Sequence, residues 1–362
     1  REPGYLFLNK DEQKQSEYEK GIKLNELFPV NSVGIVTGRD GFAIDENREK
    51  IYSRISSFCM SDPNDQKLLT LVKQSEKFQY AKIIAKGFEE NNILPISYRP
   101  FDVGYIYYSD DYVERSRKNV MRHFIDNDNI GLMICRQQKT DGFHHALVHK
   151  HLVESSYVSN KTSEIGSTFP LYLVSDSKQS SLTGDRTPNL NEELQSLLLA
   201  KVSDKDKVTP ENLFDYVYAT LHSPNYREKY KEFLKSDFPR IPSAQDSKSF
   251  WELVKLGGQL RKLHLLDEKE LGALTTTYPV SGTNEVEKLD YRDSKVYINS
   301  TQYFDGVTQE VFNFPIGGYQ PAQKWLKDRK GQTLSYEDIH HYQQIIASQT
   351  KTIEIMTKID NL

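Results

Sequence analysis

The stretch ILPISYRPFDVGYIYYS, residues 93–109, decides the fold class of the chain. Its apolar and polar positions alternate, and it is rich in Tyr and Ile, which is typical of β-strands. Pro95 and Pro100 restrict it to edge or bulged positions, because proline cannot donate a ladder hydrogen bond. Further short strands are predicted over 130–136, 146–151 and 169–174. The first half of the chain is therefore predicted to be β-rich.

Upstream of this stretch the pattern changes twice. Apolar and β-branched residues of 33–44 flank the turn-like sequence Thr37-Gly38-Arg39-Asp40-Gly41, which predicts a hairpin or a strand, a loop and a strand. Helical spacing then follows, with Ile51, Ile55 and Phe58 on one face and a second, longer helix over 68–84. Asp62-Pro63 breaks the two helices. We expect a helical insert in the β-rich half.

Helix signals dominate downstream of residue 191. Thr209-Pro210 and Ser223-Pro224 each place an N-cap residue before proline at the first helical position. A third helix is expected over 250–266, a fourth over 319–328, and a fifth opens at the capping-box-like Ser335-Tyr336-Glu337-Asp338 and runs to about residue 359. Strands over 286–289, 295–298 and 311–314 would form a small second sheet.

These patterns predict an α+β protein with no internal repeat. The polar stretch 175–191 is the best candidate for a linker, so we expect a boundary near residue 180. Residues 1–180 would form a β-rich recognition half with a helical insert. Residues 181–362 would form a mainly helical half with a small sheet.

Composition narrows the class of protein. The 362 residues contain 37% hydrophobic and 27% charged residues, as expected for a globular chain. No run approaches the 18 or more apolar residues of a membrane span, and the start Arg-Glu-Pro-Gly has neither a signal-peptide pattern nor a Met. Only two cysteines are present. We therefore expect a fragment of a cytoplasmic protein without disulfides, cysteine-rich metal sites or membrane contact.

Catalytic motifs are absent from the sequence: it contains no P-loop, dinucleotide-binding glycine pattern, nucleophile elbow or His-Glu-x-x-His. His145, His149 and His151 would share one strand face, but they spread over about 20 Å, too far apart to meet at one metal ion. Glu285-Val286-Glu287-Lys288 resembles a fragment of a metal-dependent nuclease site without a matching upstream Asp. We expect no catalytic residue, metal or cofactor in this chain.

Charge is distributed unevenly. The net charge is −4, yet the window 115–150 carries seven Lys and Arg against three Asp. Arg and Gln can form paired hydrogen bonds with base edges, whereas clustered cations bind phosphates without reading sequence. The base-reading candidates are Arg39, Arg99, Arg136, Gln137 and Gln138. The phosphate-binding candidates are Arg115, Arg117, Lys118, Arg122 and Lys139. A surface salt bridge is the alternative interpretation of each arginine, and Lys324, Lys327, Arg329 and Lys330 are the second place to look.

An ordered series of short motifs resembles the C-terminal target recognition region of single-polypeptide restriction–modification enzymes, the type ISP enzymes and related adenine-N6 DNA methyltransferases. The likeness runs from about residue 21 to residue 362. The motifs are Thr37-Gly38-Arg39-Asp40-Gly41-Phe42, Tyr98-Arg99-Pro100-Phe101-Asp102, Phe169-Pro170-Leu171-Tyr172-Leu173, Leu221-His222-Ser223-Pro224, Asp237-Phe238-Pro239-Arg240-Ile241-Pro242, Tyr319-Gln320-Pro321 and Lys324-Trp325-Leu326-Lys327-Asp328-Arg329.

The resemblance implies sequence-specific recognition of double-stranded DNA beside a methyltransferase core that uses S-adenosylmethionine. The cofactor loop and the Asn-Pro-Pro-Tyr tetrapeptide of such cores are missing here, so we expect this chain to bind DNA and its parent core without catalysing methyl transfer. Two alternatives stay open. One is a protein-interaction scaffold that couples the core to other domains, and the other is a metal-dependent nuclease.

Overall fold

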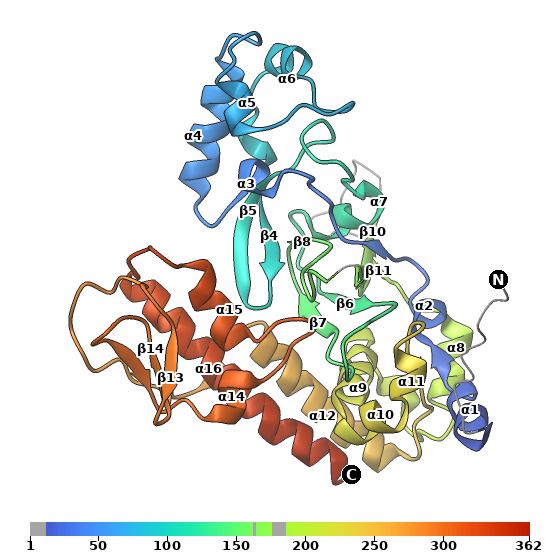
Figure 1. Ribbon diagram of the computed structural model, residues 1–362. Helices are drawn as coiled ribbons and strands as arrows, with labels where there is room; N and C mark the ends of the chain where they lie inside the picture. Colours follow the sequence, from blue (N-terminus) through green and yellow to red (C-terminus); the bar gives the residue numbers. More distant parts are fainter. Residues whose placement is uncertain (1–11, 162–163, 176–185) are drawn as a thin grey trace, which may run out of the picture.

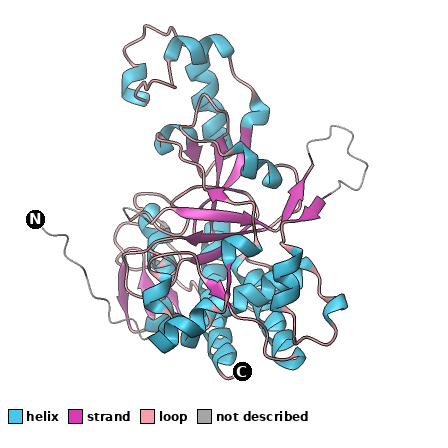
Figure 2. Ribbon diagram, turned by 90° about the vertical axis from the view of Figure 1, so that its right-hand side faces the viewer, coloured by secondary structure: helices cyan, strands magenta, loops and turns pink. Residues whose placement is uncertain are grey.

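The computed structural model describes residues 12–161, 164–175 and 186–362. Strands occupy the middle of the molecule, a helical insert stands away from them on one side, and most of the remaining helices lie on the other side (Figure 1). A view turned by 90° also has the insert projecting from the body (Figure 2). The arrangement confirms the predicted α+β class.

A four-stranded antiparallel sheet in the order β2-β9-β6-β7 lies at the centre. All five residues of β6 are buried, because both faces of the strand are covered. Leu132 and Ile134 belong to the core that contains helix α9 (Pro210–His222), while Met133 and Cys135 belong to a second core. The strands are β2 (Ser32–Val33), β6 (Gly131–Cys135), β7 (Ala146–His149) and β9 (Gly166–Pro170).

The stretch 93–109 folds into a hairpin that belongs to a second four-stranded sheet, in the order β3-β5-β4-β8. β4 pairs antiparallel with β5 and parallel with β8. The register of the hairpin shifts between Ser97 and Arg99, next to Pro100, which confirms the expected bulge. The strands are β3 (Ile44–Asp45), β4 (Ile93–Arg99), β5 (Asp102–Tyr107) and β8 (Leu152–Val153).

The segment 33–44 is not a hairpin. Its two strands, β2 and β3, belong to different sheets, and the short helix α3 (Asp40–Ala43) occupies the expected turn. The chain reaches this point by pairing Ile35 with Glu154 and Val36 with Arg115 in single bridges. The alternative expectation, a strand, a connection and a strand, describes it better.

The helical insert has its own aromatic core, and one of its helices was predicted wrongly. α4 is N-capped by Asn47, whose side chain accepts the backbone N–H groups of Glu49 and Lys50. The single helix expected over 68–84 is two short helices, because the segment between them turns to bury Phe78 against Phe42 and Phe58. The helical elements are α4 (Arg48–Cys59), α5 (Leu68–Leu71), α6 (Tyr80–Lys86) and η1 (Glu90–Asn92).

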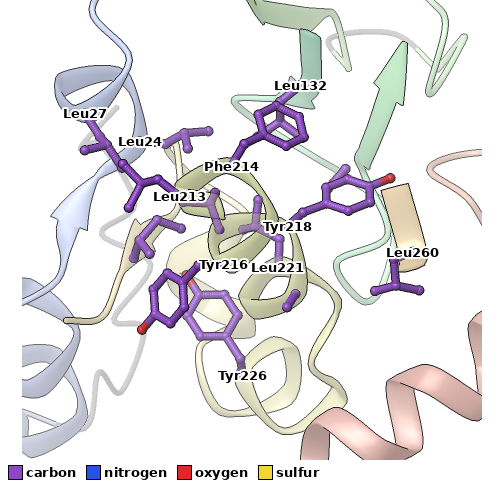
Figure 3. Close-up of a cluster of buried hydrophobic side chains, with 14 of the residues drawn as sticks. Leu24, Leu27, Leu132, Leu213, Phe214, Tyr216, Tyr218, Leu221, Tyr226 and Leu260 are labelled. Carbon is purple, nitrogen blue, oxygen red and sulfur yellow. The ribbon is translucent and has the colours of Figure 1, made fainter. Parts of the chain in front are cut away.

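Helix α9 (Pro210–His222) joins the second half to the central sheet. Thr209 caps it in a capping box, and Ser223 caps α10 (Pro224–Lys229), as the two Thr/Ser-Pro pairs predicted. Phe214 of α9 extends toward the sheet residue Leu132, and Leu24 and Leu27 belong to the same cluster (Figure 3). The hydroxyl of Tyr218 accepts the backbone N–H of Val148 of β7. α9 is therefore buried on most of its surface.

Helix α12 (Ser247–His264) crosses α9 at very close range. A Cβ atom added at Gly257 would lie 1.8 Å from the backbone oxygen of Asp215, so only glycine fits at this crossing. α16 (Tyr336–Asp360) is the longest helix of the described residues and packs beside α12; Ser335 caps it in the expected capping box.

Several short strands and helices lie around this bundle. β1 pairs with β12, and β10 pairs with β11. Their bounds, with those of the neighbouring short helices, are α1 (Glu12–Glu19), β1 (Ile22–Lys23), α2 (Leu24–Leu27), β10 (Tyr172–Val174), β11 (Arg186–Pro188), α8 (Glu192–Leu198), η3 (Lys205–Lys207), α11 (Lys231–Leu234), β12 (Arg240–Ile241) and α13 (Glu268–Leu271).

The predicted small sheet exists, and its middle strand lies where the strand over 295–298 is expected, whereas its two other strands use different residues. Its strands are β13 (Asp290–Arg292), β14 (Lys295–Tyr297) and β15 (Tyr303–Asp305). The expected strand over 286–289 is irregular, and the expected strand over 311–314 is helical, because Thr308 accepts the N–H of Val311 and caps α14 (Gln309–Asn313). α15 (Pro321–Asp328) confirms the helix predicted over 319–328.

The two large hydrophobic cores draw residues from both sides of residue 180. One joins Leu132 and Phe169 to Phe214 and Leu260, and the other joins Ile96 and Met133 to residues of α15 and α16. Part of the expected linker, residues 176–185, lies outside the described residues. The division at residue 180 stays a prediction, and packing couples the two halves closely.

Candidate nucleic-acid interface

The positively charged window 115–150 predicted from sequence is divided between two separate parts of the fold. Its first cluster lies on α7 (Lys118–Met121) and η2 (Arg122–Phe124), where His123 accepts the backbone N–H of Val174 of β10 at 3.0 Å. Its second cluster lies in the loop 136–140 that follows β6, and the backbone N–H of Gln138 donates to Lys235 just after α11 at 3.2 Å. Figure 1 has α7 and α11 on different parts of the molecule. The cations of this window therefore form two separate surfaces, one on α7 and η2 and the other in the loop 136–140.

The backbone of the loop 136–140 is bound on its inner side, whereas three of its side chains are exposed to solvent. The backbone N–H groups of Lys139 and Thr140 donate to one carboxylate oxygen of Glu164 at 2.7 and 3.0 Å. Arg136, Gln137 and Lys139 are exposed. The loop thus presents a guanidinium, a carboxamide and an ammonium group above a fixed backbone, which combines the two kinds of group that DNA recognition uses.

Gln138 differs from its neighbours because it points inward. Its side chain is buried, and its amide donates to the backbone oxygen of Leu234 at 2.8 Å. The sequence-based assignment of Gln138 to base reading does not fit this position. Its role is to fasten the loop to the end of α11.

Arg136 keeps most of its hydrogen-bonding capacity for a ligand. Its side chain is 62% exposed, and Nε donates to Asp237 at 2.9 Å. The guanidinium also lies 5.9 Å from the ring centroid of Phe238. Asp237 binds Lys23 as well, at 2.6 Å. The carboxylate therefore orients Arg136 through Nε, and within the described residues its two terminal nitrogens have no hydrogen-bond partner.

The α7 cluster surrounds a shallow hollow of about 550 Å³, lined by Tyr108, Lys118, Asn119, Arg122 and Ile125. Arg115, Lys118 and Arg122 are exposed. Lys118 forms an ion pair with Asp110 at 2.6 Å, and both partners are about half exposed. Arg117 has a left-handed backbone, and its half-buried side chain lies beside these cations. Cations around a shallow hollow are suited to phosphates rather than to bases.

Arg39 is used by the fold. Its side chain is 6% exposed and forms an ion pair with Glu114. It also donates to the backbone oxygen of Tyr112 at 2.6 Å and to the Ser75 hydroxyl at 3.1 Å, and it lies over the Phe78 ring. Burial raises the pKa of Glu114, but the bonds from Ser75 and Arg39 outweigh it and lower that pKa. Arg39 therefore joins Ser75 and Phe78 of the insert to the segment 112–114, and this buried position does not fit its sequence-based assignment to base reading.

Arg99 is also used by the fold. Its guanidinium donates to Glu154 at 2.8 Å and to the backbone oxygen of Tyr98 at 2.6 Å, and it stacks 3.8 Å from the Tyr98 ring centroid. The side chains of Arg99 and Glu154 are 12% and 6% exposed. This buried pair fixes the bulged end of β4 against the segment after β8. Arg99 is thus a structural residue, in contrast to its sequence-based assignment.

The cations of the second half, proposed as the second place to look, are mostly occupied. Arg329 is buried, stacks 3.7 Å above the Trp325 ring and donates to Asp102 at 3.1 Å. The other three lie on or after α15: Lys324 bonds Asp328, Lys327 bonds Gln323 at 3.0 Å, and Lys330 is exposed.

Another cavity, about 520 Å³, separates the β3–β5 edge from α15 and was missed by sequence reasoning. Its charged lining alternates in sign, with Lys50, Arg99, Lys324 and Arg329 beside Asp40, Asp45, Glu46, Asp102 and Asp328. Because carboxylates repel phosphates, this cavity is a poorer DNA site than the loop 136–140 or the α7 hollow.

The three histidines considered for metal binding do not converge. His145 lies against Glu164 at 3.1 Å, and His149 contacts the Thr168 hydroxyl at 2.6 Å. Burial lowers the pKa of His149 to about 3 and that of His151 to about 4. Over residues 12–161, 164–175 and 186–362, no group of three or more His, Cys, Asp or Glu side chains is arranged to hold a metal ion.

Sequence reasoning missed the two residues that organise the loop 136–140. Glu164 lies 25 residues after Lys139, and Asp237 lies 101 residues after Arg136. Glu164 belongs to no motif. Asp237 begins the motif 237–242 quoted above, but nothing in that motif indicates that its carboxylate binds Arg136.

The described helices include none with both the length and the apolar character needed to cross a membrane.

Comparison with family models identifies one family. A model of the Type ISP C-terminal specificity domain matches residues 26–358. The cryo-EM structure of a DrdV–DNA complex matches with a TM-score of 0.70 and 18% identity over 93% of this chain and 36% of that chain. A search of curated proteins gave no match.

Two further solved structures are Type ISP restriction–modification enzymes. A nuclease-deletion mutant of LlaGI in complex with a DNA substrate mimic has a TM-score of 0.68 and 17% identity, over 94% of this chain and 29% of that chain. ATP-dependent LlaBIII bound to DNA has a TM-score of 0.73 and 16% identity, over 94% and 24%. This chain therefore spans about a quarter to a third of the length of these proteins, and the likeness at such identities establishes a shared fold.

Proposed function

The chain belongs to the Type ISP C-terminal specificity domain family, and on this premise we propose that it recognises a sequence in double-stranded DNA for a restriction–modification enzyme. The family match carries the proposal. It is supported by the three similar structures, each of which is a complex with DNA or a DNA substrate mimic. We assign no reaction to the 362 residues themselves.

Base reading is assigned to the loop 136–140. Arg136 and Gln137 are exposed, and the loop backbone beneath them is fixed by Glu164 and the end of α11. A planar guanidinium can bond two acceptors of guanine, and a carboxamide can bond adenine in the same way. A fixed backbone lowers the entropy lost when these groups are ordered on DNA.

Phosphate binding is assigned to the α7 hollow and to Lys139. Arg115, Lys118, Arg122 and Lys139 are exposed cations on the two surfaces. Arg117 is kept in this set as a half-buried member beside the hollow. Contacts of this kind add affinity for every duplex and make binding fall steeply with salt concentration.

The proposal is tested by selecting duplexes from a pool with a randomised centre, using the full chain, and by titrating the selected duplex at two salt concentrations. Recognition predicts an enriched sequence and an affinity that falls linearly on a plot of log K against log salt. A chain that enriches no sequence and binds no duplex at low salt would instead be a protein-interaction scaffold. Cleavage of plasmid DNA that requires a divalent metal would favour the nuclease alternative.

We further propose that the parent protein methylates adenine N6 with S-adenosylmethionine held in a separate core, and that it acts on DNA in the cytoplasm. The solved chains leave room for such a core, since 64% or more of each lies outside the match. Calorimetric titration of the 362-residue chain with S-adenosylmethionine should give no binding heat, and methylation mapping of the host genome should identify the modified base. Cofactor binding by this chain alone would contradict the assignment.

A further inference from the structure

Glu164 lies just before β9, beneath the loop 136–140, and its side chain is fully buried. One carboxylate oxygen accepts the backbone N–H groups of Lys139 and Thr140 at 2.7 and 3.0 Å, and the Thr140 hydroxyl lies 3.3 Å from the same oxygen. The second oxygen faces His145 Nε2 at 3.1 Å and accepts the Ser159 hydroxyl. Both oxygens are therefore occupied by the fold.

We infer that Glu164 is the positioning residue of the recognition loop: it holds the backbone of 136–140 in the shape that presents Arg136 and Gln137 to DNA. This inference rests on the proposed function, since it assumes that the loop reads bases. Glu164 itself is buried and does not touch DNA. It acts on specificity through the two N–H groups that it binds.

The geometry of the loop explains why one carboxylate can do this. Gln138 points inward and bonds the oxygen of Leu234, while its neighbours Gln137 and Lys139 are exposed. The backbone N–H groups that follow point inward to Glu164. The loop is thus fastened at two adjacent points, one neutral and one charged, and only the charged one holds the N–H groups of Lys139 and Thr140.

The charge on Glu164 strengthens the attachment. Burial raises the pKa of this carboxyl, but the hydrogen bonds from Ser159, Lys139 and Thr140 outweigh it and hold the pKa at about 2. The group is therefore ionised at neutral pH, and hydrogen bonds to a charged acceptor are stronger than those to a neutral one. Opening the loop would leave a buried carboxylate with fewer donors, which is unfavourable.

Three variants of the full chain separate positioning from general stability. Glu164→Ala removes both acceptors. Glu164→Gln keeps one carbonyl oxygen for Lys139 and Thr140 and turns an amide toward Ser159 and His145, which can accept from it. Asp215→Asn is the matched control, because Asp215 is a buried carboxylate that binds Arg261 at 2.6 and 2.9 Å in the helical half.

Two measurements apply to each variant. The first is hydrogen exchange of the Lys139 and Thr140 amides. The second is the ratio of affinities for the selected duplex and for the randomised pool. We expect Glu164→Ala to speed exchange at both amides and to lower the ratio by about tenfold or more, the factor of one lost paired base contact. Glu164→Gln should retain most of the ratio, and Asp215→Asn should lower thermal stability while leaving the ratio unchanged.

The outcomes distinguish the two proposals. If Arg136→Ala with Gln137→Ala lowers the ratio but folded Glu164→Ala does not, the positioning role is wrong and the recognition loop stands. If neither change lowers the ratio, the loop does not read DNA and both proposals for it fail. Should Glu164→Ala not fold, Glu164→Asp takes its place, since it keeps the charge and shortens the reach by one methylene; an unchanged ratio in that variant would overturn the inference.

Discussion

The loop 136–140 and the packed region around β4 use arginine in opposite ways. Arg39, which contacts the insert, and Arg99, at the bulged end of β4, are nearly buried, and each faces a carboxylate, Glu114 or Glu154. In the loop, Arg136 also faces a carboxylate, Asp237, yet it is 62% exposed and bonds it through Nε. The same residue type therefore holds the fold together in one region and is displayed to solvent in the other.

The difference is one of burial rather than of pairing. A buried guanidinium needs its partners to offset the free energy of leaving water, and it cannot reach a ligand outside the protein. An exposed one stays hydrated, and its ion pair contributes little to stability. An ion pair in a structure therefore does not exclude a recognition role, whereas burial of the whole side chain does.

The largest effect expected from this comparison is on stability. Arg99→Ala leaves Glu154 buried without its cation, and removing one partner of a buried pair lowers the free energy of unfolding by about 3–5 kcal/mol. Chemical denaturation measures this, with the exposed Lys330→Ala as a control that should change stability by less than about 0.5 kcal/mol. An Arg99→Ala protein of full stability that no longer discriminates sequences would return Arg99 to the DNA surface.

The second effect is the dependence of stability on pH, which separates the buried groups of the fold from the exposed groups of the loop 136–140. Burial lowers the pKa of His149 and of His264 to about 3 each, from an ordinary value of 6.5. Below pH 6.5 the unfolded chain binds protons that the folded protein does not, so stability falls as pH falls, by about 1.4 kcal/mol per pH unit for each histidine.

Thermal or denaturant unfolding at pH 6.5 and about 5.5 should therefore differ by about 2 kcal/mol from these two groups, since each histidine of the unfolded chain is already half protonated at pH 6.5. Discrimination between duplexes should stay constant over that range, because His149 and His264 are buried and neither is among the proposed base-reading residues. Loss of discrimination in a folded sample at the lower pH would mean that a titrating group contributes to the reading surface.

The third effect is on sequence preference. Replacing Arg136 or Gln137 by Ala should relax the preference at one base position by about 1–3 kcal/mol. Stability should change by less than about 0.5 kcal/mol, because both side chains are exposed. Arg136→Lys is the control: it keeps the charge but loses the planar fork, so it should restore affinity without the preference. Selection from the randomised pool reads out all three variants.

The smallest effect is on the salt dependence of binding. Lys118→Ala and Lys139→Ala should each weaken all duplexes alike and reduce the slope of log K against log salt by about one unit. Titration of one duplex at several salt concentrations measures the slope. A variant with an unchanged slope would remove that lysine from the phosphate surface.

Local sequence predicted the second-half helices well. Thr209, Ser223 and Ser335 each cap a helix where their motifs indicate one, because a cap acts within three residues of itself. Prediction from local sequence failed where apolar residues pack against residues that are distant in the chain. Phe78 and Tyr80 suggest a continuation of one helix, but the chain turns to place them in an aromatic cluster with Phe42 and Phe58.

For the proposed interface, the chemistry of the residues predicted the window but could not sort its members into exposed and buried side chains. Gln138, three residues after the end of β6, is buried under the loop. Six other candidates are exposed: Arg115, Lys118, Arg122, Arg136, Gln137 and Lys139. Glu164 carried no signal at all, since nothing near it in the chain marks a carboxylate that binds backbone N–H groups elsewhere.

The sequence by itself determined the fold class, the capped helices, the buried strands β6 and β7 and the family, because each depends on residues that are close together or on their order along the chain. Only the tertiary structure decided which cations are available to DNA. The carboxylates that engage Arg39, Arg99 and Arg136 lie 75, 55 and 101 residues away in the chain. Whether such a pair is buried depends on how the insert, the sheets and the helices pack, and burial sets the free energy of leaving an ion without its partner.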